Sequence, residues 1–150
     1  MTERPVEVAS TGLNREGREG REGMGADIER LARVIVDAGL KVHRTLGAGL
    51  LESAYEHCLA HELQIRGILC RRQVPLPIIY EGIQLDAGYR IDMLVENAII
   101  IEVKAVDALT RVHDAQILTY LRLSSCRLGF LMNFNVELFK HGLKRMVLSS

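Results

Sequence analysis

The fold is decided by residues 88–106, which read GYRIDMLVENAIIIEVKAV. Two runs rich in apolar and β-branched residues flank the turn-like pair Glu96-Asn97, and this pattern predicts a β-hairpin. Charged residues interrupt both runs, Asp92 in the first and Glu102 and Lys104 in the second. Because side chains alternate across a strand, Glu102 and Lys104 should lie on the same face of the sheet.

These charged residues indicate a divalent-metal site. A strand this apolar is normally buried, and a buried charge is costly unless it is paired or coordinates a metal. Asp92 and Glu102 offer the hard oxygen ligands that Mg²⁺ prefers and that also suit Mn²⁺. Lys104 would stabilise negative charge on a phosphate. The pattern therefore predicts phosphodiester hydrolysis, and the structural alternative is an ion-pair network of the two acids with Lys104 and Arg90.

Several motifs along the chain resemble a known nuclease superfamily. An aspartate followed one strand later by Glu-X-Lys is similar to the signature of the PD-(D/E)XK nucleases. Residues 49–55, GLLESAY, fit the signature of its GxxExxY family, and residues 42–47, VHRTLG, resemble the entry into that motif. Gln116 and Tyr120 resemble the Q-x-x-x-Y helix that follows the E-x-K strand, and residues 131–135, LMNFN, resemble the late strand.

The resemblance extends from about Asp27 to about Leu148, and one departure is Ile91, which stands where the superfamily has a proline. It implies an α/β fold of the restriction-endonuclease type, with a mixed β-sheet flanked by helices, and a nuclease that uses Mg²⁺ or Mn²⁺ to cut DNA. The ion would polarise the scissile phosphate and lower the pKa of the attacking water. The implied metal ligands are Asp92, Glu102, the backbone carbonyl of Val103, and Glu52. The implied catalytic residues are Glu52, Asp92, Glu102, Lys104, Gln116 and Tyr120.

Glu52 also stands out by its position on the second expected helix. On a helical wheel it falls within the apolar arc of that helix, close to Leu59 and Leu63. That arc comprises Leu51, Tyr55, Cys58, Leu59 and Leu63. A carboxylate that faces a core needs a partner, which a metal would supply. The alternative is a helix-start carboxylate stabilised by the helix dipole. For Gln116 and Tyr120, the alternative is ordinary polar decoration of an amphipathic helix.

Composition limits the classes of function. The chain has 150 residues, enough for one domain with a substantial core, and its 19 Lys and Arg balance its 19 Asp and Glu. A tight, non-specific DNA coat protein would be strongly basic, so nucleic acid would be bound through local backbone contacts. Candidate phosphate contacts are Arg66, Arg71, Arg72, Arg111, Lys140, Lys144 and Arg145. No aromatic residues are interleaved with these cations, so base stacking on single strands is not indicated.

The cysteines indicate a cellular setting. Cys58, Cys70 and Cys126 are odd in number and widely spaced, which favours reduced thiols in the cytoplasm over a disulfide framework or a zinc cluster. No apolar run approaches the length of a membrane span, and the N-terminus lacks the apolar core of a signal peptide. The sequence is also compatible with a homodimer.

The order of elements predicts a mixed α/β sandwich. Residues 1–25 form a polar leader with a repeated Arg-Glu-Gly unit, which we predict to be disordered, and residues 26–150 form the nuclease-like domain. A first helix is expected from a capping Asp27 to residue 46. Further helices are expected over residues 50–66 and 112–124, and strands over residues 73–80, 88–96, 98–106, 127–134 and 143–148.

Two other readings of the sequence compete with the nuclease. His57 and His61 have the i, i+4 spacing of a zinc site, but Cys58 stands where the metalloprotease motif requires glutamate, so both rings are expected on the solvent side. His43 is expected to be a packed or helix-end histidine. The competing function is a non-catalytic nucleic-acid- or protein-binding module that retains the nuclease fold. The complete set of Glu52, Asp92, Glu102 and Lys104 argues against that module.

Overall fold

A mixed five-stranded sheet forms the centre of the protein, in a computed structural model that describes residues 21–149. The strands lie in the order β1-β4-β5-β6-β7. Their bounds are β1 (Cys70–Pro75), β4 (Arg90–Val95), β5 (Ile99–Lys104), β6 (Leu128–Asn133) and β7 (Leu143–Val147). Strands β5 and β6 run parallel, and the other neighbouring pairs are antiparallel.

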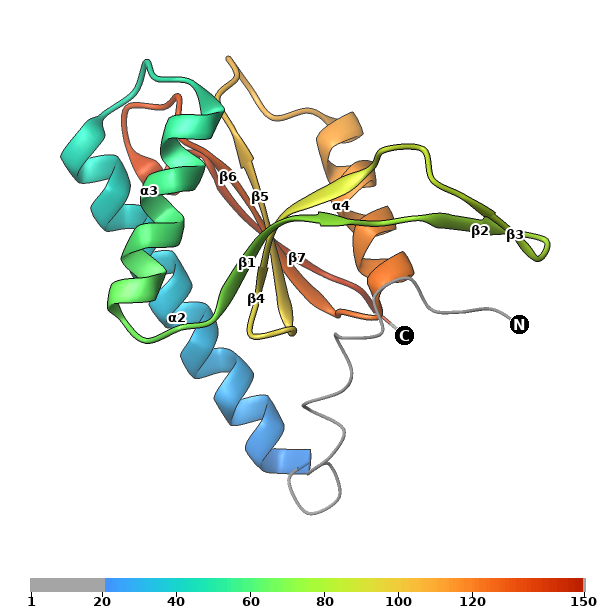
Figure 1. Cartoon of the computed structure of the whole chain (residues 1–150). Coiled ribbons are helices and arrows are strands. Elements are labelled where there is room, and N and C mark those ends of the chain that lie inside the picture. The colour runs from blue at the N-terminus through green and yellow to red at the C-terminus, as the bar shows by residue number, and fades with distance from the viewer. Residues whose placement is uncertain (1–20, 150) are drawn as a thin grey trace.

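Helices cover both faces of this sheet (Figure 1). Helices α2 (Arg21–Leu46) and α3 (Glu52–Ile65) pack on one face, and α4 (Arg111–Ser124) packs on the other. A short 3₁₀ helix, η1 (Phe139–His141), precedes β7 and packs against α2. The predicted α/β class, a mixed sheet flanked by helices, is confirmed.

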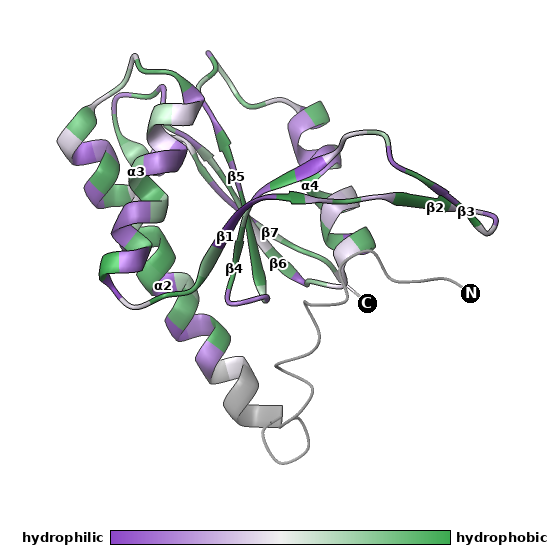
Figure 2. Ribbon diagram, viewed as in Figure 1, coloured by the Kyte–Doolittle hydropathy of each residue, from purple (hydrophilic) through white to green (hydrophobic). Residues whose placement is uncertain are grey.

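Alternation along the central strands creates two separate cores. Met93 and Ile101 belong to the core beneath α2 and α3, whereas Leu94 and Ile100 belong to the core beneath α4. Both faces of these strands are therefore buried, which explains why the strands read as nearly continuous apolar runs. Figure 2 shows the same contrast, with strongly hydrophobic central strands and helices in which hydrophobic and hydrophilic residues alternate.

The predicted hairpin of β4 and β5 is confirmed. The strands pair in register from Val95 opposite Ile99 to Met93 opposite Ile101. Glu96 has a φ of 52° and the next residue a φ of 55°, and asparagine tolerates this left-handed conformation well. The turn closes with the N–H of Ala98 donating to the carbonyl of Val95 at 2.9 Å.

The predicted strand over residues 73–80 is wrong in its extent. Strand β1 begins earlier, at Cys70, and ends at Pro75, because two prolines close together, Pro75 and Pro77, cannot donate to a continuous ladder. A second short strand then pairs with a third to form an unpredicted arm, β2 (Ile78–Tyr80) with β3 (Ile83–Leu85). Figure 1 shows this arm extending away from the body of the domain.

The first helix also departs from its predicted bounds. Helix α2 begins at Arg21, and Asp27 lies inside it, ion-paired with Arg30, so the predicted Asp27 cap is wrong. Residues 21–26 contain four good helix formers, arginine, glutamate, methionine and alanine, besides Gly23 and Gly25, and the helix continues through Asp27. Residues 1–20 lie outside the described part of the chain, so the disordered leader and its boundary stay a prediction. In residues 21–149, no helix is both long and apolar enough to cross a membrane.

Candidate active site

Asp92 and Glu102 meet at the end of the β4–β5 hairpin that lies away from its turn. The ladder is regular as far as Met93 opposite Ile101, and one further step would place Asp92 opposite Glu102. Here side chains replace the ladder bonds: the N–H of Asp92 donates to Oε2 of Glu102 at 3.1 Å. In return, the N–H of Val103 donates to Oδ2 of Asp92 at 2.9 Å. These crossed bonds hold both carboxylates at one point between the strands.

The two carboxylates repel each other in a poorly solvated place. Glu102 is only 2% exposed, and its burial, followed by the charge of Asp92, raises its pKa well above the usual value. Burial also raises the pKa of the half-buried Asp92, against the opposing effect of the hydrogen bond from Val103. The ion pairs within residues 21–149 include neither acid, so the predicted structural alternative with Arg90 is not formed there.

Lys104 contributes a positive charge beside both acids. It is half-buried and lies at the end of β5, two residues after Glu102. Its charge lowers the pKa of Asp92 and of Glu102, against the larger effect of burial on each. The lysine therefore lies near the pair without forming a direct contact ion pair with either acid.

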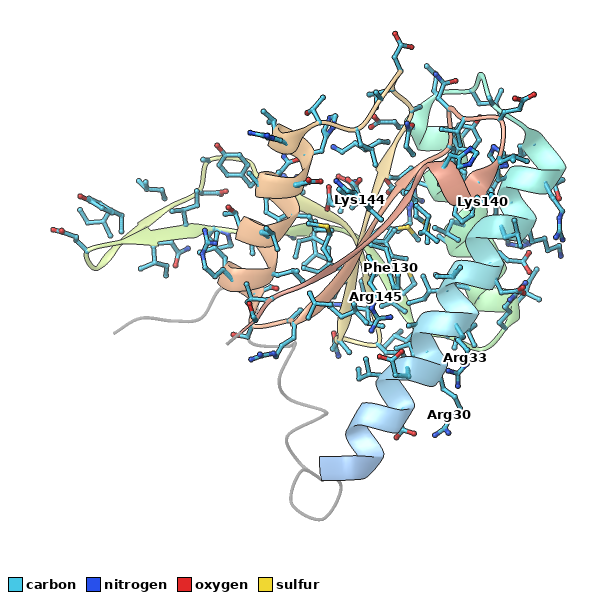
Figure 3. The ribbon with its side chains drawn as sticks, turned by 180° about the vertical axis from the view of Figure 1, so that it is seen from behind. Arg30, Arg33, Phe130, Lys140, Lys144 and Arg145 are labelled. Atoms are coloured by element: carbon cyan, nitrogen blue, oxygen red, sulfur yellow. The ribbon has the colours of Figure 1, made fainter. Side chains whose placement is uncertain are left out.

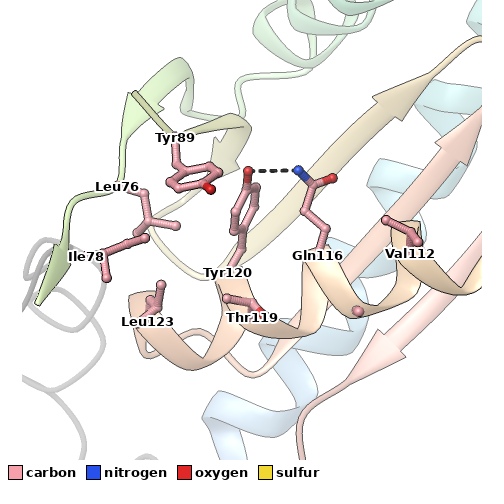
Figure 4. A pocket seen from close by; sticks show the side chains of 9 residues that line it. Leu76, Ile78, Tyr89, Val112, Gln116, Thr119, Tyr120 and Leu123 are labelled. Carbon is pink, nitrogen blue, oxygen red and sulfur yellow. Dashed lines mark hydrogen bonds between the residues drawn. The ribbon is translucent and has the colours of Figure 1, made fainter. Parts of the chain in front are cut away.

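Gln116 and Tyr120 approach the acids from α4. Nε2 of Gln116 donates to Oη of Tyr120 at 3.1 Å, as one helical turn separates them (Figure 4). Burial, then the charge of Glu102, raises the pKa of the Tyr120 phenol, and the charge of Asp92 adds to this effect. The phenol thus stays protonated at neutral pH and lies within electrostatic reach of the paired carboxylates.

Glu52 lies close to the site, but not as predicted. It is exposed at the start of α3, and its Oε2 accepts the N–H of Ala105 at 3.3 Å. The predicted apolar arc is wrong at this end, because Leu51 is 77% exposed and Cys58 is exposed too. The buried apolar face of α3 consists of Tyr55, Leu59 and Leu63. Glu52 thus lies where the alternative interpretation placed it, as a carboxylate at the start of a helix.

The structure does not gather a larger metal-binding cluster around the acids. Among residues 21–149, no group of three or more histidine, cysteine, aspartate or glutamate side chains is arranged to hold a metal. Asp92 and Glu102 are therefore brought together as a pair. Besides burial, the charge of Glu52 reaches Asp92 and raises its pKa, and a role for Glu52 as a third ligand stays a prediction. Val103 contributes to the site through its N–H, which donates to Asp92. A role for its carbonyl as a metal ligand stays a prediction.

Sequence reasoning missed a polar network behind Asp92. Glu56 is buried on α3, and its Oε2 accepts Nε of Arg72 at 3.0 Å. Nε2 of Gln73 donates to both oxygens of Glu56 at 3.1 Å and lies 3.5 Å from Oδ1 of Asp92. One signal was available, because Glu56 follows Glu52 by four residues and so shares its helix face.

Gln73 reaches Asp92 because its backbone departs from regular strand geometry. Strand β1 pairs Arg72 with Met93 and Val74 with Ile91, which leaves Gln73 facing Asp92 outside the ladder. Gln73 has a φ of 53°, a left-handed conformation that costs roughly 1–3 kcal/mol for a residue other than glycine. Strain of this kind persists where the surrounding contacts fix it, and here those contacts turn the amide toward the acids.

Two other motif residues, Tyr55 and Asn133, hold the loops next to the site in place. Oη of Tyr55 donates to the carbonyl of Gly47 at 2.6 Å and accepts the N–H of Leu50 at 3.1 Å, while its ring stacks on Phe134. These bonds fix the loop that delivers α3. Buried Asn133 binds both the N–H and the carbonyl of Val106, and so holds the loop that follows β5.

The histidines lie where the sequence predicted. His43 is buried and contacts the carbonyl of Val136 at 2.7 Å through Nε2, as expected for a packed histidine near a helix end. His57 and His61 are both exposed on the solvent side of α3, which confirms that prediction.

Several predicted phosphate contacts are already engaged by acids. Arg66 binds Glu62 and Asp37. Lys144 and Arg145 neighbour each other on β7 and bind Asp114 and Glu29 respectively. Figure 3 shows the cations of β7 and α2 on the face opposite that of Figure 1. These ion pairs reduce the positive charge that this face presents to a phosphate backbone.

A family model described as the PD-(D/E)XK nuclease superfamily matches residues 29–146. The chain belongs to the PD-(D/E)XK nuclease superfamily. The matched span runs from within α2 to within β7 and includes both central acids and Lys104. Neither among curated proteins nor among solved structures was a match found. The mixed sheet with its flanking helices is thus the restriction-endonuclease-like fold, and membership supports a nuclease that acts on nucleic acid.

Proposed function

We propose that this chain is a divalent-metal-dependent nuclease of the GxxExxY branch, which hydrolyses phosphodiester bonds in DNA. The observation that carries the proposal is the crossed pairing of Asp92 and Glu102 at the opened end of the hairpin. A fold gains nothing from placing a buried carboxylate against a half-buried one without a cation, because, beyond the effect of burial, the charge of Asp92 raises the pKa of Glu102. A bound cation would relieve this repulsion.

The donor set fits Mg²⁺ or Mn²⁺. Both ions prefer carboxylate oxygens, and Mg²⁺ is commonly held by one or two carboxylates, with waters and substrate phosphate completing its octahedron. Asp92 and Glu102 supply such a pair, and each carboxylate is fixed by a single backbone N–H. When bound, a divalent ion supplies positive charge to the scissile phosphate and lowers the pKa of a neighbouring water.

The remaining residues would bind and orient the substrate. Lys104 lies beside both acids and would stabilise the negative charge that develops on the phosphate oxygens. Tyr120 keeps its proton at neutral pH and can donate its hydroxyl hydrogen to a phosphate oxygen or a water. Gln116 orients that hydroxyl group by donating to its oxygen. Glu52 would act from the entrance of the site, anchored on the N–H of Ala105.

Mn²⁺ should stabilise the wild-type fold, and Asp92→Asn should remove that effect. A ligand at 100 times its dissociation constant adds about 2.7 kcal/mol, which raises the melting temperature of a chain this size by roughly 5–10 °C. Asparagine keeps an oxygen for the N–H of Val103 but loses the charge. Thermal melts with and without Mn²⁺ provide the measurement, and Asp86→Asn, an exposed acid before β4, is the control. An equal rise for Asp92→Asn and wild type would contradict the assignment.

Gln73→Asn should weaken metal binding without changing the stability of the metal-free protein. Asparagine tolerates the left-handed φ of this position and keeps the amide, but it is one methylene too short to span Glu56 and Asp92. Because partners behind a metal ligand typically contribute 10–100-fold to metal affinity, we expect a loss of about that size, measured by Mn²⁺ titration. The melting temperature without metal should change little. Gln84→Asn on β3 is the matched control, and an unchanged Mn²⁺ affinity for Gln73→Asn would refute the positioning role.

A further inference from the structure

A pocket of about 360 Å³ lies between α4 and the segment that joins β1 to β2. Leu76 and Ile78 form one wall together with Tyr89, and the α4 residues Gln116 and Tyr120 face them (Figure 4). Its volume falls within the range of roughly 300–1,000 Å³ that is typical of small-molecule sites. Tyr89 is 45% exposed, so the pocket opens to solvent.

The lining of this pocket selects a flat, uncharged group. None of the nine side chains that line it carries a charge, so the pocket offers no ionic partner for a phosphate. Its polar groups are two phenols, the amide of Gln116 and the hydroxyl of Thr119. Aromatic and apolar walls with a few hydrogen-bonding groups are the surroundings in which proteins hold a nucleobase outside a duplex.

The pocket lies beside the candidate active site, and Tyr120 links the two. Gln116 and Tyr120 line it, and the Tyr120 phenol lies close enough to Glu102 for the charge of that acid to raise its pKa. Tyr89 precedes β4 and stands three residues before Asp92. A group seated in the pocket would therefore lie next to a phosphate held at the two acids.

We propose that the pocket holds an unpaired nucleobase adjacent to the scissile phosphate, so that the protein acts on single-stranded or locally opened DNA. The inference rests on the proposed nuclease function and deepens it by naming the form of the substrate. A paired base is stacked and hydrogen-bonded within the duplex, so only an unpaired or extruded base can enter. The sequence does not suggest stacking, because Tyr89 and Tyr120 are far apart in the chain and are brought together only by the fold.

Two DNA ligands distinguish binding of a base from binding of the phosphate backbone. Single-stranded DNA and an abasic strand of the same length share a phosphate backbone, and only the first carries bases. Both are titrated by fluorescence anisotropy against Glu102→Gln in Mg²⁺, since this variant should leave them uncut. Ala115→Phe fills the pocket from an exposed position on α4, and Tyr89→Leu removes the ring but keeps apolar bulk. Ala108→Phe, at an exposed alanine outside the pocket, is the matched control.

We expect Ala115→Phe and Tyr89→Leu each to weaken binding of the intact strand about ten-fold, the scale of one stacked base. The abasic strand should bind less tightly from the start and lose nothing further in either variant. This non-additivity is the signature of a direct contact between pocket and base. Ala108→Phe should bind both strands like the parent, and Tyr89→Phe should keep most of the affinity.

The outcomes separate this inference from the nuclease proposal. If both pocket variants weaken the intact and abasic strands equally, or weaken neither, the nucleobase assignment is wrong, whatever the protein cleaves. If filling the pocket instead turns a dimer into a monomer in sedimentation and leaves DNA binding unchanged, the occupant is a second copy and the assignment is also wrong. Non-additive loss in a protein that cuts no substrate would support the pocket and refute the nuclease.

Discussion

Glu102→Gln should abolish cleavage and yet raise the melting temperature of the metal-free protein. Glutamine keeps an oxygen that can accept the N–H of Asp92, so the crossed backbone bond survives. It loses one of two charged metal ligands, and a metal ion contributes several kcal/mol to the transition state, so the rate should fall by about 10³-fold or more. If Glu102 had only a structural role, Glu102→Gln would instead lower the melting temperature of the metal-free protein.

The sign of the stability effect follows from the pKa of Glu102. Burial, then the charge of Asp92, raises that pKa in the folded state well above its unfolded value. The folded protein therefore loses stability as pH rises from the unfolded pKa through the folded one, because an uncharged group must ionise in a poorly solvated place. Glutamine cannot ionise. Its advantage should be a few degrees near pH 7–8 and should vanish as the pH falls to about 4.5, near the unfolded pKa.

Glu62→Gln is a control with the opposite expected sign. Burial tends to raise the pKa of Glu62, but hydrogen bonds from Arg66 and Lys41 outweigh it, so the pKa is lowered overall. Its carboxylate stabilises the fold above the unfolded pKa, and that stability is lost as pH falls through the folded one. Glu62→Gln should thus lower the melting temperature at pH 7. If Glu102→Gln also melts lower without metal, Glu102 belongs to a structural network.

Lys104→Met should lower the cleavage rate by about 10²–10³-fold and leave DNA affinity largely intact. Methionine keeps an unbranched apolar stem of similar volume, so the end of β5 should pack as before. The loss is that of one preorganised positive charge at the phosphate, and removal of one such donor has an effect of this size. Single-turnover cleavage and anisotropy titrations measure rate and affinity separately.

Arg127→Met supplies the matched comparison for Lys104→Met. Arg127 is exposed just before β6, at the end of that strand away from Lys104, so its substitution tests the removal of one positive charge in general. We expect its cleavage rate to stay within about two-fold of wild type, because a single exposed charge is screened by solvent and salt. A Lys104→Met protein that cleaves as fast as Arg127→Met would remove Lys104 from the mechanism.

The sequence predicted those parts of the site that depend on local rules. The turn at Glu96-Asn97 and the alternation along each strand place Asp92 and Glu102 side by side, and the structure confirms this register. Lys104 follows from the same alternation. Such inferences succeed because the period of a strand and the chemistry of a tight turn depend on neighbouring residues only.

The parts that sequence missed depend on contacts between distant segments. Glu52 and Glu56 lie one turn apart, and the entry angle of α3 decides which of them is buried; it buries Glu56. Gln73 reaches Asp92 only because Gln73 itself takes a left-handed backbone conformation opposite Asp92, which no local sequence pattern predicts. Tyr89 and Tyr120 share a pocket because α4 packs across the face of the sheet, next to the segment that precedes β4.

Cleavage by the purified wild-type protein tests the central claim most directly. Labelled single-stranded, double-stranded and branched DNA, and the corresponding RNA, are incubated with Mg²⁺, with Mn²⁺ and with a chelator. We predict cleavage of DNA with either ion, none with the chelator, and none by Glu102→Gln. If every substrate remains uncut with both ions while DNA is still bound, the protein is a binding module that retains the nuclease fold, and the proposed activity is wrong.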